Sequence, residues 1–151
     1  MGQINGAAIE RLQVNDPYSG LRVLVAEDDG LVSLALQDIL TDMGCEVVGS
    51  ASEANAAMSL VNQARADVAF LDYWLHGKPV DAVADALITR GVPIVLATGF
   101  GTQDIVPRLR HVPLLRKPYI VEDVEDVLSQ LLMPPTLLLR GVDHDAGQLA
   151  G

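Results

Sequence analysis

The chain has 151 residues, of which 50% are apolar and 20% are charged, and ten Lys and Arg against twenty Asp and Glu give a formal net charge of −10 at pH 7. This composition is enough for one domain with a sizeable core, and it excludes a disordered chain. The negative charge argues against nucleic acid and membrane as partners, and no apolar run approaches the length of a membrane span. The single cysteine, Cys45, fits a reducing cytoplasm.

Short apolar runs alternate with segments of helical periodicity along the chain. The runs predict five buried strands, at residues 21–26, 46–50, 67–71, 92–97 and 112–115. Four of the connections carry apolar residues at helical spacing, beginning at Val32, Ala57, Val80 and Val124. The turn-forming residues agree, since Gly44 and Gly91 are placed to end the first and third helices and Pro79 is placed to begin the third.

The fourth connection differs from the others. Residues 99–111 include two glycines and a central proline, Pro107, which predicts a short or irregular helix. Strict alternation of strands and helices indicates an α/β fold, a doubly wound parallel sheet of flavodoxin-like strand order 2-1-3-4-5. We expect this domain at residues 21–133, preceded by an extension (1–20) and followed by a tail (134–151).

Polar residues follow the predicted strands at the edge where such folds bind ligands. They are Glu27, Asp28 and Asp29 after the first strand, Asp72 after the third, Thr98 after the fourth, and Lys117 after the fifth. Converging carboxylates repel one another, so a proton or a cation has to lie among them, and hard oxygen ligands suit magnesium, with manganese as the alternative. Asp29 is expected to cap the first helix instead. A carboxylate, a metal, a lysine and a hydroxyl together predict a phosphoryl site.

The motifs LVAEDD, FLDYWL, LATG and RKP resemble those of the receiver domains of bacterial two-component response regulators, over residues 21 to 133. This resemblance implies that Asp72 is the phosphoacceptor and that Thr98 and Lys117 bind the phosphoryl group. It also implies a metal site made by Asp72, Asp28, Glu27 (partly through water) and the backbone carbonyl of Trp74. The bond before Pro118 is often cis in this family.

Two positions depart from the pattern of the family. Leu114 stands where receivers usually carry an aromatic switch residue, and the segment PIVLATGF resembles a single-domain subgroup with a Phe-Ala-Thr-Gly signature, although Leu96 replaces its phenylalanine. We expect unchanged phosphorylation chemistry and an unusual conformational readout, in which Phe100 moves with Thr98. The large apolar side chains of Trp74 and Phe100 also predict slow loss of the phosphoryl group.

The resemblance implies a stand-alone phosphorylation switch rather than an enzyme. It would receive its phosphoryl group from a sensor histidine kinase or a histidine phosphotransfer protein, and would signal through a downstream protein or a homodimer. One alternative is a magnesium-dependent phosphohydrolase, but such enzymes commonly carry a second acid at the position of Trp74. Another is a pseudo-receiver without the chemistry, against which the complete set of site residues argues.

Overall fold

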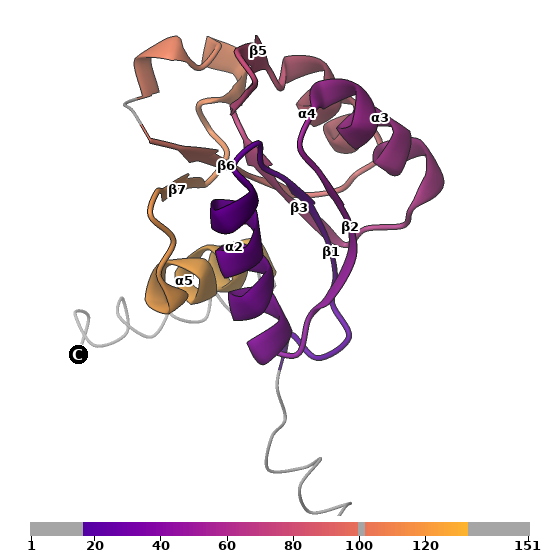
Figure 1. The fold of residues 1–151 in the computed structure, drawn as a ribbon, viewed down its shortest axis with the longest axis vertical. Coiled ribbons are helices and arrows are strands. Elements are labelled where there is room, and N and C mark those ends of the chain that lie inside the picture. Colours follow the sequence, from indigo (N-terminus) through magenta and orange to yellow (C-terminus); the bar gives the residue numbers. More distant parts are fainter. Residues whose placement is uncertain (1–16, 100–101, 133–151) are drawn as a thin grey trace, which may run out of the picture.

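The computed structural model describes residues 17–99 and 102–132, so most of the expected extension, Phe100 and the expected tail lie outside the described residues. Five parallel strands form the sheet in the order β2-β1-β3-β6-β7, which confirms the predicted architecture (Figure 1). The strands are β1 (Arg22–Ala26), β2 (Glu46–Ala51), β3 (Val68–Asp72), β6 (Ile94–Thr98) and β7 (Leu114–Arg116).

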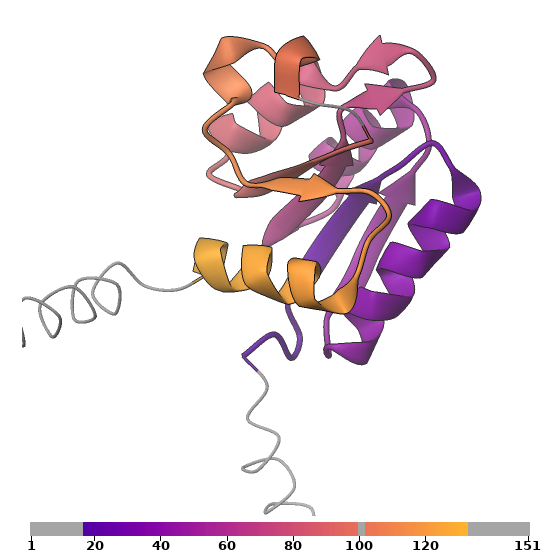
Figure 2. The same cartoon turned by 90° about the vertical axis from the view of Figure 1, so that its left-hand side faces the viewer.

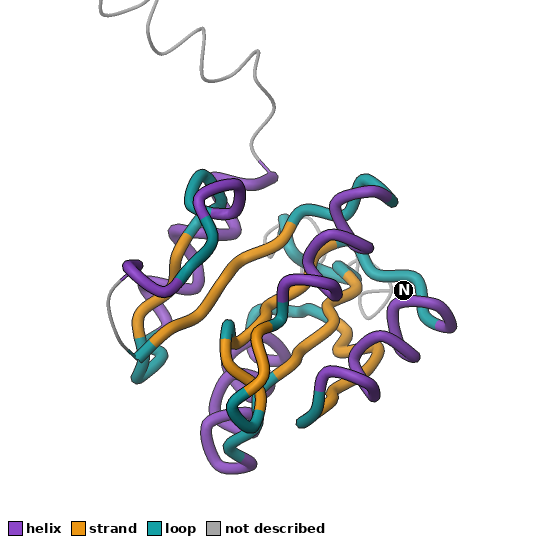
Figure 3. The backbone as a smooth tube through the Cα atoms, turned by 90° about the horizontal axis from the view of Figure 1, so that it is seen from above, coloured by secondary structure: helices purple, strands orange, loops and turns teal. Residues whose placement is uncertain are grey.

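Helices cover both faces of this sheet, as Figures 2 and 3 show. The helices α2 (Gly30–Asp42) and α5 (Val121–Leu132) pack on one face, against side chains such as Val23, Val25 and Phe70. The helices α3 (Ala54–Gln63) and α4 (Asp81–Thr89) pack on the other, against Leu24 and Leu71. Because successive strand residues point to opposite faces, β1 and β3 must be apolar throughout, which is why they read as continuous runs in the sequence.

The ends of the helices follow local chemistry. The Asp29 carboxylate accepts hydrogen bonds from the backbone N–H groups of Leu31 and Val32, so Asp29 caps α2 as expected. Gly44 and Gly91 follow the ends of α2 and α4 with positive φ angles of 91° and 76°, a conformation that glycine adopts without a steric penalty.

The predicted start of the third helix was wrong by two residues. Pro79 belongs to a hairpin of β4 (Trp74–Leu75) and β5 (Lys78–Pro79), and α4 begins at Asp81. The turn residues His76 and Gly77 have positive φ angles of 48° and 77°, the combination that favours a tight two-residue hairpin. Two-residue strands are too short to produce a detectable alternation, so the sequence pattern did not reveal them.

The connection from β6 to β7 is irregular, as predicted. Its described residues form two short 3₁₀ helices, η1 (Thr102–Asp104) and η2 (Pro107–Leu109). Ile105 and Leu109 anchor this segment because both are buried in the core shared with α3 and α4. Across the described ranges, none of the helices combines the length and the apolar character needed to cross a membrane.

Candidate functional site

The carboxyl ends of β1 and β3 bring three carboxylates together. Glu27 and Asp28 follow β1, and Asp72 is the last residue of β3, its neighbour in the sheet. Each offers an oxygen, and these oxygens all lie within 4.8 Å of one another. Glu27 and Asp72 are buried, with 2% and 5% of their surface exposed, whereas Asp28 is half-buried. Solvent and ligands therefore approach the cluster on the side of Asp28.

Lys117 reaches this cluster from the far edge of the sheet. It follows β7, and its Nζ lies 2.6 Å from Asp72 Oδ2 and 2.8 Å from Glu27 Oε1. The peptide bond between Lys117 and Pro118 is cis. Burial acts to lower the pKa of Lys117, but its bonds to Asp72 and Glu27 outweigh that effect and raise the pKa above its ordinary value. Lys117 therefore stays protonated and compensates one of the three negative charges.

The carboxylates differ in their electrostatic environment. Burial, with the charge of Glu27 acting in the same direction, raises the pKa of Asp72 to about 6, against the effect of Lys117. Burial also acts to raise the pKa of Asp28, but the backbone N–H of His76, 3.0 Å from Asp28 Oδ2, helps to hold that pKa below its ordinary value. Three acids against one lysine leave negative charge for a hard cation, so the residues present fit a magnesium ion.

Two contacts of the cluster did not emerge from the sequence. The Tyr119 hydroxyl donates to Glu27 Oε1 at 3.2 Å, and the Asp29 N–H donates to Glu27 Oε2 at 3.0 Å. Burial and the neighbouring carboxylates, Glu27 first, raise the pKa of Tyr119, so its hydroxyl remains a donor. Tyr119 lies two residues beyond Lys117, and its hydroxyl so close to the end of a strand is the signal that could have indicated it.

Of the other predicted residues, Thr98 and Trp74 contact residues of this cluster and Leu114 does not. Thr98 ends β6, the strand between β3 and β7, and its carbonyl accepts a hydrogen bond from the Lys117 N–H at 3.3 Å. The backbone N–H of Trp74 donates to Asp72 Oδ1 at 3.3 Å, and the residue as a whole is 36% exposed. Leu114 begins β7 opposite Leu96 and packs on the core rather than at the acidic cluster.

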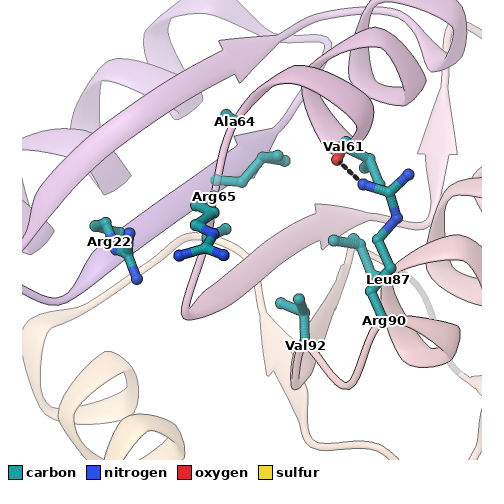
Figure 4. Close-up of a pocket in the computed structure, with 9 residues that line it drawn as sticks. Arg22, Val61, Ala64, Arg65, Leu87, Arg90 and Val92 are labelled. Carbon is teal, nitrogen blue, oxygen red and sulfur yellow. Dashed lines mark hydrogen bonds between the residues drawn. The ribbon is translucent and has the colours of Figure 1, made fainter.

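A separate cavity of about 350 Å³ lies at the opposite ends of the strands, beside Arg22 at the start of β1 (Figure 4). Arg22 forms an ion pair with Asp67, and Arg90 donates to the Val61 carbonyl near the end of α3. These arginines already bind groups of the fold itself. The acidic cluster is therefore the candidate site.

A family model of the response regulator receiver domain matches residues 23–113. The chain belongs to this family. The transcriptional regulatory protein PdtaR of Mycobacterium tuberculosis is 32% identical over 107 residues, which cover 68% of this chain and 52% of PdtaR. The phyllosphere-induced regulator PhyR of Methylorubrum extorquens is 26% identical over 131 residues, 82% of this chain and 48% of PhyR.

Solved structures agree with this assignment. The solution structure of SdrG from Sphingomonas melonis Fr1 superposes with a TM-score of 0.69 at 32% identity, covering 76% of this chain and 98% of SdrG. This chain spans about half the length of the curated relatives PdtaR and PhyR, 52% and 48%. Receiver domains are phosphoacceptor modules of two-component signalling, and the acidic cluster is compatible with magnesium.

Proposed function

We propose that Asp72 accepts a phosphoryl group from a phosphohistidine of a sensor kinase or a phosphotransfer protein. An oxygen of the Asp72 carboxylate attacks phosphorus, an O–P bond forms, and the P–N bond to the donor histidine breaks with its electron pair passing to the imidazole. The observation that carries this proposal is the buried Asp72 carboxylate, which lies 2.6 Å from Lys117 and beside Glu27 and Asp28.

The surrounding residues have complementary roles in this proposal. Lys117 exchanges its contact with Asp72 for one with the phosphoryl oxygens, and the Thr98 hydroxyl donates a hydrogen bond to them. Asp28, Asp72, Glu27 and the carbonyl of Trp74 would hold a magnesium or manganese ion, which when bound neutralises charge on the phosphoryl oxygens. Asp28 suits direct coordination because its carboxyl is ionised and half-buried.

The output of this switch is proposed to be a protein contact that depends on phosphorylation. The relatives PdtaR and PhyR are a transcriptional regulatory protein and a phyllosphere-induced regulator, which supports a role in signalling. The net charge of −10 opposes binding to duplex DNA. A salt-sensitive, tight complex of this chain with duplex DNA would contradict the proposed output.

Acetyl phosphate and magnesium provide the test of the phosphoacceptor. Mass spectrometry of the intact protein should show one added phosphoryl group, and Asp72→Asn should abolish it. Asp67→Asn serves as the matched control because Asp67 lies just before β3, at the opposite end of the strand. Phosphoryl addition that survives Asp72→Asn would refute the assignment.

The metal site has its own test. Asp28→Asn removes one negative charge from the cluster, so magnesium affinity should fall in a calorimetric titration. An unaltered titration curve would show that Asp28 is not a ligand.

A further inference from the structure

Tyr73 directly follows Asp72 and is among the largest fully buried side chains of the described structure, with 2% of its surface exposed. Its ring lies in the same core as Ile105 and Leu109, the buried residues of the irregular segment between β6 and β7. The side chain of Tyr73 therefore connects the end of β3 with residues 102–111, which we call the η segment.

The backbone of Tyr73 is held on two sides. Its N–H donates to the carbonyl of Ala97 at 3.0 Å, one residue before Thr98, and its carbonyl accepts from the Val80 N–H at 2.8 Å. Because Tyr73 is bonded both to the neighbour of Thr98 and to the residue before α4, a shift at the end of β3 is transmitted to its ring rather than absorbed by a loose loop.

The hydroxyl of Tyr73 bonds to the η segment and lies near the start of α4. It accepts a hydrogen bond from the Val106 N–H at 3.3 Å, just before η2. The Asp81 carboxylate at the start of α4 lies close enough to act on the pKa of Tyr73. Burial and Asp81 raise the pKa of Tyr73, so the hydroxyl stays protonated. The bond to Val106 is long and therefore weak, and the nearby buried Asp81 Oδ1 has no hydrogen-bond partner among the described residues.

We infer that the Tyr73 hydroxyl is the link through which phosphorylation of Asp72 controls the η segment. In the unphosphorylated protein the hydroxyl holds Val106 in place, and a shift of the β3 end on phosphorylation breaks this bond and releases the segment. Leu114, at the position of the usual aromatic switch, has no polar end to make such a bond, whereas Tyr73 makes it from β3. This inference rests on the proposed phosphorylation of Asp72.

Segments with little regular hydrogen bonding are those that rearrange most readily. The η segment has two 3₁₀ turns and one ion pair to α4, between Arg108 and Asp85 at 2.8 Å, whose side chains are 56% and 47% exposed. An exposed ion pair contributes little. Ile105 and Leu109 hold the segment in the core, and the Tyr73 hydroxyl adds the hydrogen bond that joins Val106 to the end of β3.

Amide hydrogen exchange followed by NMR tests this link, with beryllofluoride and magnesium as the phosphoryl mimic. In the unmodified protein the mimic should speed exchange of the Val106 amide about fivefold, as expected for loss of one hydrogen bond. Tyr73→Phe keeps the ring and removes the hydroxyl, so Val106 should already exchange at the fast rate without the mimic, and the mimic should add little.

Two measurements separate a coupling role from a merely structural one. Phosphoryl addition to Asp72, read by mass, should be unchanged in Tyr73→Phe, since the hydroxyl does not touch the acidic cluster. Ser59→Ala is the control, because its hydroxyl donates to the Asn55 carbonyl within α3 and its loss should leave the response of Val106 intact.

A Tyr73→Phe variant that is phosphorylated normally and still shows the full response of Val106 would overturn the link alone. Absence of phosphoryl addition in the unmodified protein would overturn the proposed function and the link together. A uniform rise in exchange over all core strands in Tyr73→Phe, with the response to the mimic preserved, would also contradict the link, since it would reduce Tyr73 to a packing residue.

Discussion

Individual side chains set the chemistry of this receiver domain. Trp74, two residues after Asp72, is the one expected to affect loss of the phosphoryl group. It is the residue whose carbonyl is proposed as a metal ligand, and its indole lies edge-on to Tyr73 with ring centroids 5.3 Å apart. Trp74 is 36% exposed, so it lies at the surface beside Asp72 in the chain instead of in the core. A large apolar side chain next to the phosphoacceptor offers no group to orient an attacking water.

Replacing Trp74 by Asn should therefore shorten the lifetime of the phosphoryl group on Asp72. We expect decay to accelerate on the order of tenfold, which corresponds to ~1.4 kcal/mol in activation free energy. Decay of labelled protein after removal of acetyl phosphate measures the rate, and Trp74→Phe, which keeps an apolar ring, should remain slow. Rapid decay in the unmodified protein would show that the ring does not restrict water.

A second prediction at this scale concerns the ion pair of Arg22 and Asp67, which joins the starts of β1 and β3. Asp67 accepts from the Arg22 guanidinium and from its backbone N–H, and these bonds hold the pKa of Asp67 below its ordinary value of 3.8. A lowered pKa means that the stabilisation is present above pH 3.8 and is lost as the pH falls through the folded-state pKa.

Asp67→Asn should accordingly lower the urea midpoint at pH 7, by a modest amount because both side chains are partly exposed. The difference from the unmodified protein should shrink as the pH is taken below about 4. A difference that persists unchanged in acid would mean that the charge of Asp67 is not what stabilises the pair.

Among the elements, the β4–β5 hairpin shows how local backbone geometry supports the site. Its turn residue His76 donates a backbone N–H to Asp28 Oδ2, and this turn requires positive φ at both His76 and Gly77. Glycine adopts this conformation freely, whereas a residue with a Cβ, such as His76, adopts it only at an energetic cost. The hairpin therefore depends on Gly77 for its shape and Asp28 depends on the hairpin for one hydrogen bond.

Gly77→Ala should destabilise the protein by about 1 kcal/mol, because φ is 77° there although a Cβ would meet no atom within 4 Å. Urea denaturation measures the change. Gly30→Ala is the matched control, since Gly30 also has open space around it and its φ is not positive. Equal effects of the two substitutions would rule out backbone strain as the cause.

At the scale of the whole molecule, one sheet separates two apolar cores. Leu40 of α2 belongs to the core under α2 and α5, and Leu87 of α4 belongs to the core under α3 and α4. Strands β1 and β3 contribute side chains to both cores. Loss of packing in one core therefore also disturbs the strands that form the other core. The acidic cluster lies at the common edge of these strands and depends on both cores.

Leu40→Ala and Leu87→Ala should therefore each lower the free energy of unfolding by about 3 kcal/mol, and circular dichroism and Trp74 fluorescence should report one coincident transition. Leu34→Ala, on the exposed face of α2 at 57% exposure, should change stability by less than about 0.5 kcal/mol. Two separate transitions would show that the cores unfold independently.

The five strands, the irregular connection before β7 and the cap at Asp29 could be predicted because each depends on short-range patterns. The strand order followed from the doubly wound class of fold that the alternation of strands and helices indicates. Continuous apolar runs mark strands buried on both faces, and proline and glycine mark interruptions. Asp72 and Lys117 could be predicted as neighbours because parallel strands end at one edge. The β4–β5 hairpin could not be predicted, because strands of two residues are too short to show an alternation of apolar and polar residues.

By itself, then, the sequence determined the class of fold, the family and the edge at which its charged residues meet. The tertiary structure decided which atoms touch. Only it shows that Lys117 lies between Asp72 and Glu27, that Tyr119 completes the surroundings of Glu27, and that the Tyr73 hydroxyl reaches Val106 across 33 positions. Such contacts join residues far apart in the chain, and their geometry follows from packing both cores around one twisted sheet, which no local pattern of residues records.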